Sequence, residues 1–185
     1  SDIDYNFLVD RFGRLYEGRY GGMSRPVLGG HTAGFNENTF AIVALGNFES
    51  TKPSATNMAA IKDAIARLSA WKLGLYGVNP GSTARLVSAG FIRATKYPKG
   101  SVALIPALSS HQTVNYTACP GRYLQAQIPA IRTIDENLGF RDIGMEKSRG
   151  EGASWIAVLF ALHRWLYRPM SAIGLVSRTE NAVDN

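Results

Sequence analysis

Residues 40–48 read FAIVALGNF, a run that is apolar except for Gly46 and Asn47. An apolar run of this length without polar alternation is typical of a strand buried on both faces, as in the middle of an α/β sheet. Pro53-Ser54 then opens the strongest helix candidate, which Gly74 and Gly77 end. Its apolar side chains recur every three or four residues: Met58, Ile61, Ile65, Leu68, Trp71 and Leu75. These two segments predict a sheet covered by a long helix.

Further elements lie on both sides of this pair. Residues 5–9 and 14–17 flank Asp10-Arg11-Phe12-Gly13 and predict a β-hairpin, with Gly13 free to adopt a positive φ. A glycine-rich loop covers residues 18–30. Strands are expected at 85–88 and 101–108, where Pro106 indicates an edge or an early end. Helices follow at 121–127 and from Pro129 to about residue 138. The predicted fold class is α/β, a mixed central β-sheet flanked by helices, with a C-terminal helical extension.

The 185 residues suggest one domain, or one domain and a tail. We expect a domain over residues 1–138, a polar linker over 139–152 and a helical extension over 153–185. Residues 153–167 are apolar almost all round, which fits a helix packed on the domain, an interfacial helix or a tail without a role. No apolar run reaches the roughly 20 residues of a membrane span. No signal peptide stands at Ser1.

Composition excludes disorder and leaves the class of partner open. Apolar residues make up 45% and charged residues 18%, as in a folded protein. The net charge of +6 favours an anionic partner (nucleic acid, a membrane surface or an acidic polymer) or reflects solubility alone. Because the cationic residues are scattered, with no aromatic–basic stripe, no nucleic-acid partner is expected.

Residues 111–121 read HQTVNYTACPG and carry the chemistry. They hold the one cysteine, Cys119, and one of three histidines, His111. A thiolate and an imidazole are typical zinc ligands. Cys119 alone could also be a buried small side chain or a reactive thiol. The helix expected after Gly121 should lower the pKa of the thiol. Thr117 is close enough in sequence to reach the same metal.

Several motifs, in matching order over residues 2–135, resemble one family. The chain is similar to zinc-dependent N-acetylmuramoyl-L-alanine amidases of the type-2 amidase and peptidoglycan-recognition-protein superfamily. The motifs are Asp2-Ile3-Asp4-Tyr5-Asn6-Phe7-Leu8-Val9, Gly13-Arg14-Leu15-Tyr16-Glu17-Gly18-Arg19, Gly30-His31-Thr32-Ala33-Gly34-Phe35-Asn36, Ala44-Leu45-Gly46-Asn47-Phe48, Trp71-Lys72-Leu73-Gly74 and Tyr116-Thr117-Ala118-Cys119-Pro120-Gly121.

The resemblance implies a function and a site. His111 and Cys119 would be two of three Zn²⁺ ligands, and Tyr5 and Thr117 would be catalytic, orienting water and stabilising the oxyanion. His31 and Asn36 would bind substrate. The reaction would be hydrolysis of the amide between N-acetylmuramic acid and L-alanine, with peptidoglycan as partner and a secreted or cell-wall location.

Without the family, two of these residues have plainer interpretations. Tyr5 would be a strand tyrosine half in the core, and Thr117 a turn residue bonding its own loop.

The chain also departs from the family pattern. The third zinc ligand of the family is a histidine on a strand that precedes the motif beginning at Asp2, so the domain over 1–138 is expected to be N-terminally incomplete. Gln112 and Thr113 stand where the family usually has Arg-Asp. His31 could replace that histidine as the third ligand, but its motif lies where the family has its groove histidine. An upstream histidine is therefore the stronger candidate. Two functions follow: an amidase, impaired in this chain, or a non-catalytic peptidoglycan-binding module.

Overall fold

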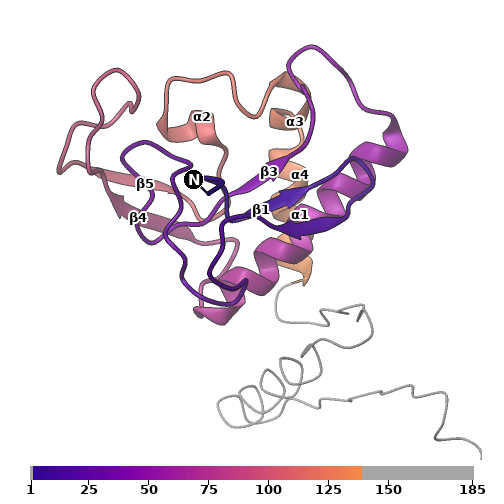
Figure 1. The fold of residues 1–185 in the computed structure, drawn as a ribbon, viewed down its shortest axis with the longest axis horizontal. Helices are drawn as coiled ribbons and strands as arrows, with labels where there is room; N and C mark the ends of the chain where they lie inside the picture. The colour runs from indigo at the N-terminus through magenta and orange to yellow at the C-terminus, as the bar shows by residue number, and fades with distance from the viewer. Residues whose placement is uncertain (1, 139–185) are drawn as a thin grey trace, which may run out of the picture. The chain divides into compact units, whose positions relative to one another are not determined.

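A computed structural model describes residues 2–138, without the side chains of 135–138. The linker and the helical extension expected over 139–185 lie outside the described residues. Three strands, a long helix, two more strands and three helices follow one another in the described part of the chain, and they confirm the mixed sheet with flanking helices (Figure 1). In the part that the structure describes, no helix is long and apolar enough to cross a membrane.

The first sheet has three strands in the order β2-β1-β3. β1 (Phe7–Val9) pairs antiparallel with β2 (Leu15–Glu17) and parallel with β3 (Ile42–Ala44). The β1–β2 pair is the expected hairpin, and Gly13 in its turn has φ +81°. A left-handed residue at that position is far less costly for glycine than for other residues.

The second sheet is separate and consists of β4 (Thr83–Val87) and β5 (Val102–Pro106), paired antiparallel. Pro106 ends β5, as expected. The mixed sheet is the three-stranded one, and among the described residues β4 and β5 form a second, antiparallel sheet. The strand expected over 40–48 is also shorter, with three half-buried residues in β3. Among the described strands, β3 has a partner, β1, along one edge only. It therefore lies at the edge of its sheet and not in the middle, where the sequence predicts it.

The helices begin close to where the sequence signals place them. α1 (Ala55–Leu75) starts after Ser54, whose Oγ accepts a hydrogen bond of 3.2 Å from the Asn57 N–H. α2 (His111–Val114) and α3 (Arg122–Gln125) are single turns, and α4 is Ile128–Leu138. α4 packs on α1, and their apolar side chains form the main core with β1. Its buried members are Val9, Phe48, Ile61, Ala64, Ala66, Leu124, Ile128 and Ile131.

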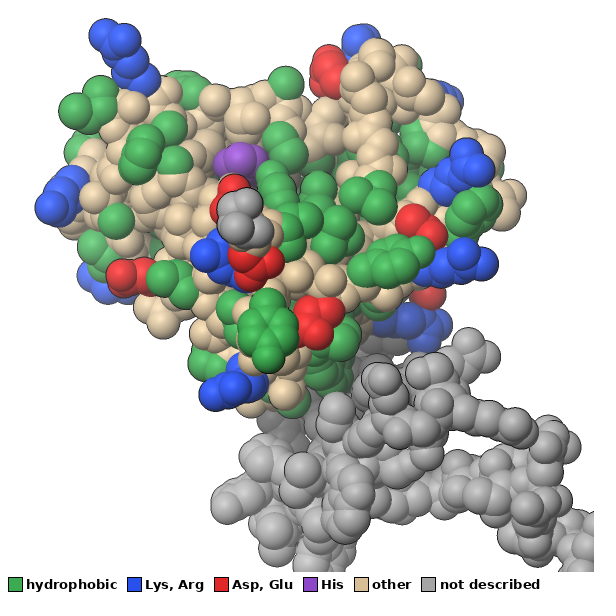
Figure 2. Space-filling view, in the orientation of Figure 1, with side chains coloured by type: hydrophobic (Ala, Val, Ile, Leu, Met, Phe, Trp, Pro, Cys, Tyr) green, Lys and Arg blue, Asp and Glu red, His purple; other side chains and the backbone are tan. Residues whose placement is uncertain are grey.

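Two smaller clusters complete the described core. Phe35, Ala103, Ile105 and Val114 form the core beneath the second sheet. Phe7, Leu68 and Trp71 pack β1 on α1. Figure 2 shows Lys and Arg side chains dispersed over the visible face, as the sequence indicates.

Candidate active site

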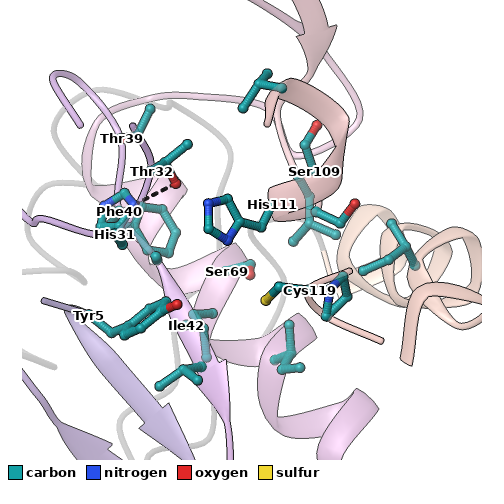
Figure 3. A pocket seen from close by; sticks show the side chains of 18 of the residues that line it. Tyr5, His31, Thr32, Thr39, Phe40, Ile42, Ser69, Ser109, His111 and Cys119 are labelled. Carbon is teal, nitrogen blue, oxygen red and sulfur yellow. Dashed lines mark hydrogen bonds between the residues drawn. The ribbon is translucent and has the colours of Figure 1, made fainter. Parts of the chain in front are cut away.

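A cavity of about 700 Å³ lies between the two sheets and collects most of the predicted site residues. Tyr5, His31, His111 and Cys119 all line it (Figure 3). Its walls are mainly apolar. They come from β3 (Ile42, Val43, Ala44), the second sheet (Ala84, Leu86, Ile105, Pro106) and α1 (Ile65, Ser69, Leu73).

His31 is held firmly at the edge of this cavity. Its ring stacks on Tyr5 with the centroids 6.4 Å apart, and its Nδ1 lies 2.9 Å from Thr32 Oγ1. A side chain at Gly29 would collide with the imidazole, so the chain comes this close only with glycine there. His31 Nε2 is buried and has no hydrogen-bond partner among the described residues. This nitrogen lies close to Gly29 and has an unused capacity for a hydrogen bond.

Both histidines are neutral at pH 7. Burial, followed by the neighbouring His111, lowers the pKa of His31 to about 4, and Arg19 adds to this while Asp4 opposes it. Burial also lowers the pKa of His111. His111 Nδ1 is buried without a partner among the described residues. Neutral imidazole is the form that binds metal ions and accepts hydrogen bonds.

Cys119 differs from the expectation. Burial raises the pKa of its thiol, whereas the sequence predicts a lowered one. α3 begins at Arg122 and has only four residues, so Cys119 lies outside its first turn. The thiol is protonated at pH 7, and a metal ion bound there would displace that proton.

The Tyr5 phenol also stays protonated at pH 7. Burial raises its pKa, and the nearby Cys119 and Asp4 add to the rise. Tyr5 can therefore donate a hydrogen bond into the cavity.

Thr117 and Asn36, by contrast, are not among the residues that line the cavity. Thr117 Oγ1 accepts a hydrogen bond of 3.1 Å from the Cys119 N–H, the loop-bonding alternative that the sequence left open. Asn36 Oδ1 accepts one of 2.7 Å from the Thr32 N–H. Each of them supports a neighbour that lines the cavity. Their direct roles in catalysis and substrate binding remain predictions.

The donor set fits part of a zinc site. His111 offers a buried, unpartnered imidazole nitrogen, and Cys119 is a half-buried free thiol in the same cavity. Nitrogen and sulfur donors suit zinc. Within residues 2–138, however, no three His, Cys, Asp or Glu side chains are grouped so that they could hold a metal ion. His31 faces the cavity but does not complete such a group.

The sequence analysis missed two residues, one that lines the cavity and one that holds the loop leading to His31. Ser69 is fully buried, lines the cavity, and its hydroxyl has no partner among the described residues. Its position four residues after Ile65 could have placed it on the buried face of α1. Lys72 is 4% exposed and donates to the carbonyls of Met23 and Arg25, at 2.7 Å each. It anchors the loop that leads to His31.

Comparisons with known proteins identify the family of this chain. The family model described as N-acetylmuramoyl-L-alanine amidase matches residues 1–122. Peptidoglycan-recognition protein SC2 of Drosophila melanogaster is 35% identical over 128 residues, which is 69% of this chain and 52% of that protein. Peptidoglycan-recognition protein SA of the same species is 39% identical over 66 residues, 36% of this chain and 30% of that protein.

Two further proteins are similar over different lengths. N-acetylmuramoyl-L-alanine amidase of Mus musculus is 33% identical over 65 residues, 35% of this chain and 12% of that protein. Among solved structures, the endolysin N-acetylmuramoyl-L-alanine amidase LysCS from Clostridium intestinale aligns with TM-score 0.41 and 22% identity. That alignment covers 69% of this chain and 61% of that one. The chain thus spans about half or less of the curated relatives it matches. By its match over residues 1–122, it belongs to the N-acetylmuramoyl-L-alanine amidase family, and it is also similar to peptidoglycan-recognition proteins.

Proposed function

We propose that this domain is the core of a zinc-dependent amidase that cleaves the bond between N-acetylmuramic acid and L-alanine in peptidoglycan, outside the cell or at the cell wall. The observation that carries the proposal is the meeting of His111 and Cys119 with Tyr5 and His31 in one cavity. In this reading His111 and Cys119 hold zinc. When bound, zinc would act as a Lewis acid that polarises a carbonyl and activates water.

The other cavity residues have roles that follow from their protonation states. Tyr5 donates its phenolic proton in a hydrogen bond to the oxygen that gains charge during amide cleavage. His31, neutral at pH 7, uses Nε2 to bind and orient the stem peptide. Thr117 acts by holding the Cys119 backbone, and Asn36 by holding Thr32 beside His31.

The third zinc ligand comes, in this proposal, from a strand inserted beside β3. Ala41 O and Leu45 N bond to β1, so the alternating backbone groups of Ile42 and Ala44 point to the opposite, unpaired edge. Among the described strands, β5 likewise has one partner, β4. The cavity runs along residues 39–44 on one side and 105–111 on the other. A strand here would join the two sheets, and the family resemblance implies that such a strand carries the histidine.

A second candidate function is peptidoglycan binding without hydrolysis. The observation that favours it is the pair of metal-binding side chains, where a catalytic zinc site needs three. The cavity and the unpartnered His31 nitrogen would serve binding equally well.

The experiment compares this chain with a version extended at its N-terminus by a family strand bearing histidine. Release of a free L-alanine amino group from a muramoyl peptide is measured by chromatography. The extended chain should hydrolyse the peptide, and His111→Ala or Cys119→Ser should abolish both hydrolysis and zinc binding. Tyr5→Phe should lower kcat by about 10²–10³-fold, whereas Tyr20→Phe, at a residue 88% exposed, should not.

Calorimetric titration with the same peptide separates the two candidates. Hydrolysis by the extended chain supports the amidase. Peptide binding that needs His31, with no hydrolysis even in the extended chain loaded with zinc, supports the binding module.

A further inference from the structure

The outer face of the second sheet carries large apolar side chains in water. In the β4–β5 register, Val87 pairs with Val102 and Arg85 with Leu104, and all four side chains are exposed. Leu104 is 67% exposed and Val87 56%. The opposite face of the same strands is buried or half-buried and holds Ala84, Leu86, Ala103 and Ile105. The sheet therefore has apolar residues on both faces, with no described element covering one of them.

The loop that joins β4 to β5 carries further exposed apolar side chains. Ile92 is 91% exposed and Phe91 66%, side by side in a turn that the Ala94 N–H closes on the Phe91 carbonyl. Arg93 follows with φ +66°, a conformation that L-residues seldom adopt. The turn thus presents two bulky apolar side chains and a cation to the outside.

The charges around this face are mostly positive. The sequence has no Asp or Glu between Asp63 and Asp135. Arg85, Arg93 and Lys99 are exposed, and none forms an ion pair with a described residue. Lys99 packs against Gly90, next to the turn. One exposed carboxylate, Glu37, lies on the loop whose Gly34 carbonyl accepts from the Ala89 N–H. Figure 2 shows hydrophobic and cationic side chains side by side at the left, where Figure 1 draws β4, β5 and their loop.

We propose that this β4–β5 surface (Arg85, Val87, Phe91, Ile92, Arg93, Lys99, Val102 and Leu104) docks on an anionic lipid bilayer. The three cations match the phosphate layer of such a bilayer. Phe91 and Ile92 enter the boundary between headgroups and acyl chains, where leaving water is favourable. A soluble polyanion would pair with the cations but would leave the apolar turn in water. Exposed apolar side chains gathered on one face, rather than scattered singly, are what mark an interaction surface.

The test is co-sedimentation of the full 185-residue chain with vesicles of phosphatidylcholine alone or of phosphatidylcholine with one-quarter phosphatidylglycerol. We expect binding to the anionic vesicles to be at least about tenfold tighter, since each cation near the surface contributes roughly fivefold at low salt. Salt should weaken it. Phe91→Ser/Ile92→Ser should reduce binding at least about tenfold by removing the apolar part.

A matched control is Tyr20→Ser/Leu28→Ser, which removes two exposed apolar side chains from another loop (88% and 57% exposed). It should leave vesicle binding unchanged. Because both variants retain residues 139–185, the comparison also controls for any vesicle binding by those residues. Equal thermal melting of both double variants shows that they fold. No binding to anionic vesicles, or equal binding by the turn variant and the wild type, would overturn the proposal. The proposal would also fail if soluble polyphosphate displaced the chain from the vesicles and the turn variant bound as tightly as the wild type. That result would assign the surface to soluble polyanions.

Discussion

The two sheets of this molecule differ in what supports them. The three-stranded sheet lies against α1 and α4, and the cluster shared with these helices is the largest described core. The two-stranded sheet has a core of four buried residues and a bare outer face. The cavity lies between these halves, with Tyr5 and His31 from the first and His111 and Cys119 from the segment after the second. The site residues therefore meet at the boundary between a well-packed half and a lightly packed one.

The largest effect should come from the well-packed half. Ile131 is fully buried between α4 and α1, and Ile131→Ala should lower the free energy of unfolding by about 4 kcal/mol. Ile105 is buried but borders the cavity, so fewer packing contacts are lost, and Ile105→Ala should cost about 2 kcal/mol. Urea unfolding of both variants measures the difference. An equal or larger loss of unfolding free energy in Ile105→Ala would show that the two halves do not differ in packing.

Acid should lower the free energy of unfolding, because His31 is buried in its neutral form. The pKa of His31 is about 4 in the folded chain and 6.5 in the unfolded chain. As the pH falls, the unfolded chain therefore binds a proton first. The stability contributed by neutral His31 is complete above pH 6.5 and is lost towards pH 4, by at most about 3 kcal/mol at 1.36 per pKa unit. Urea unfolding at pH 7, 5.5 and 4.5 tests this. His31→Gln should flatten the dependence, and an unchanged slope would contradict the assigned cause.

Lys72 tests how the well-packed half holds the loop that leads to His31. Lys72→Met keeps the stem but removes the two hydrogen bonds to the Met23 and Arg25 carbonyls. We expect a loss of about 2 kcal/mol and faster hydrogen exchange over residues 22–27. Arg67→Met is the matched control on the same helix, where the exposed pair with Asp63 is worth about 0.5 kcal/mol or less. Comparable losses in the two variants would show that Lys72 is not an anchor.

The smallest effect concerns helix caps in the two halves. Ser54 caps α1 through its side chain, and Ser54→Ala should cost about 1 kcal/mol. Ser110 stands at the same position before α2 but makes no capping bond. Ser110→Ala should therefore cost less in a thermal melt. The reverse order would mean that the short helix contributes more to stability than its packing indicates.

The sequence predicted the parts of the fold that depend on local chemistry. The hairpin around Gly13 and the helix that Ser54 starts follow from turn and cap residues that act within a few positions. The short β3 and the separation of the sheets depend on which strands lie beside each edge, and a single strand sequence does not encode this.

The candidate site shows the same division. The family resemblance identified Tyr5, His31, His111 and Cys119 before the structure brought them to one cavity. The direction of the Cys119 pKa could not be predicted, because burial by distant residues outweighs the nearby helix start. Ser69 and Lys72 were missed for a related reason: their partners, or the lack of them, become visible only in the packed structure.

Bound zinc distinguishes a complete metal site from a partial one. The 185-residue chain and the version extended by the histidine-bearing strand are equilibrated with zinc, dialysed, and analysed for bound metal. The chain alone should retain little zinc. The extended chain should hold one equivalent, which is lost in His111→Ala and Cys119→Ser and retained in His31→Ala. Tight, stoichiometric zinc in the chain alone, lost in His31→Ala, would show that His31 is the third ligand and would contradict the account.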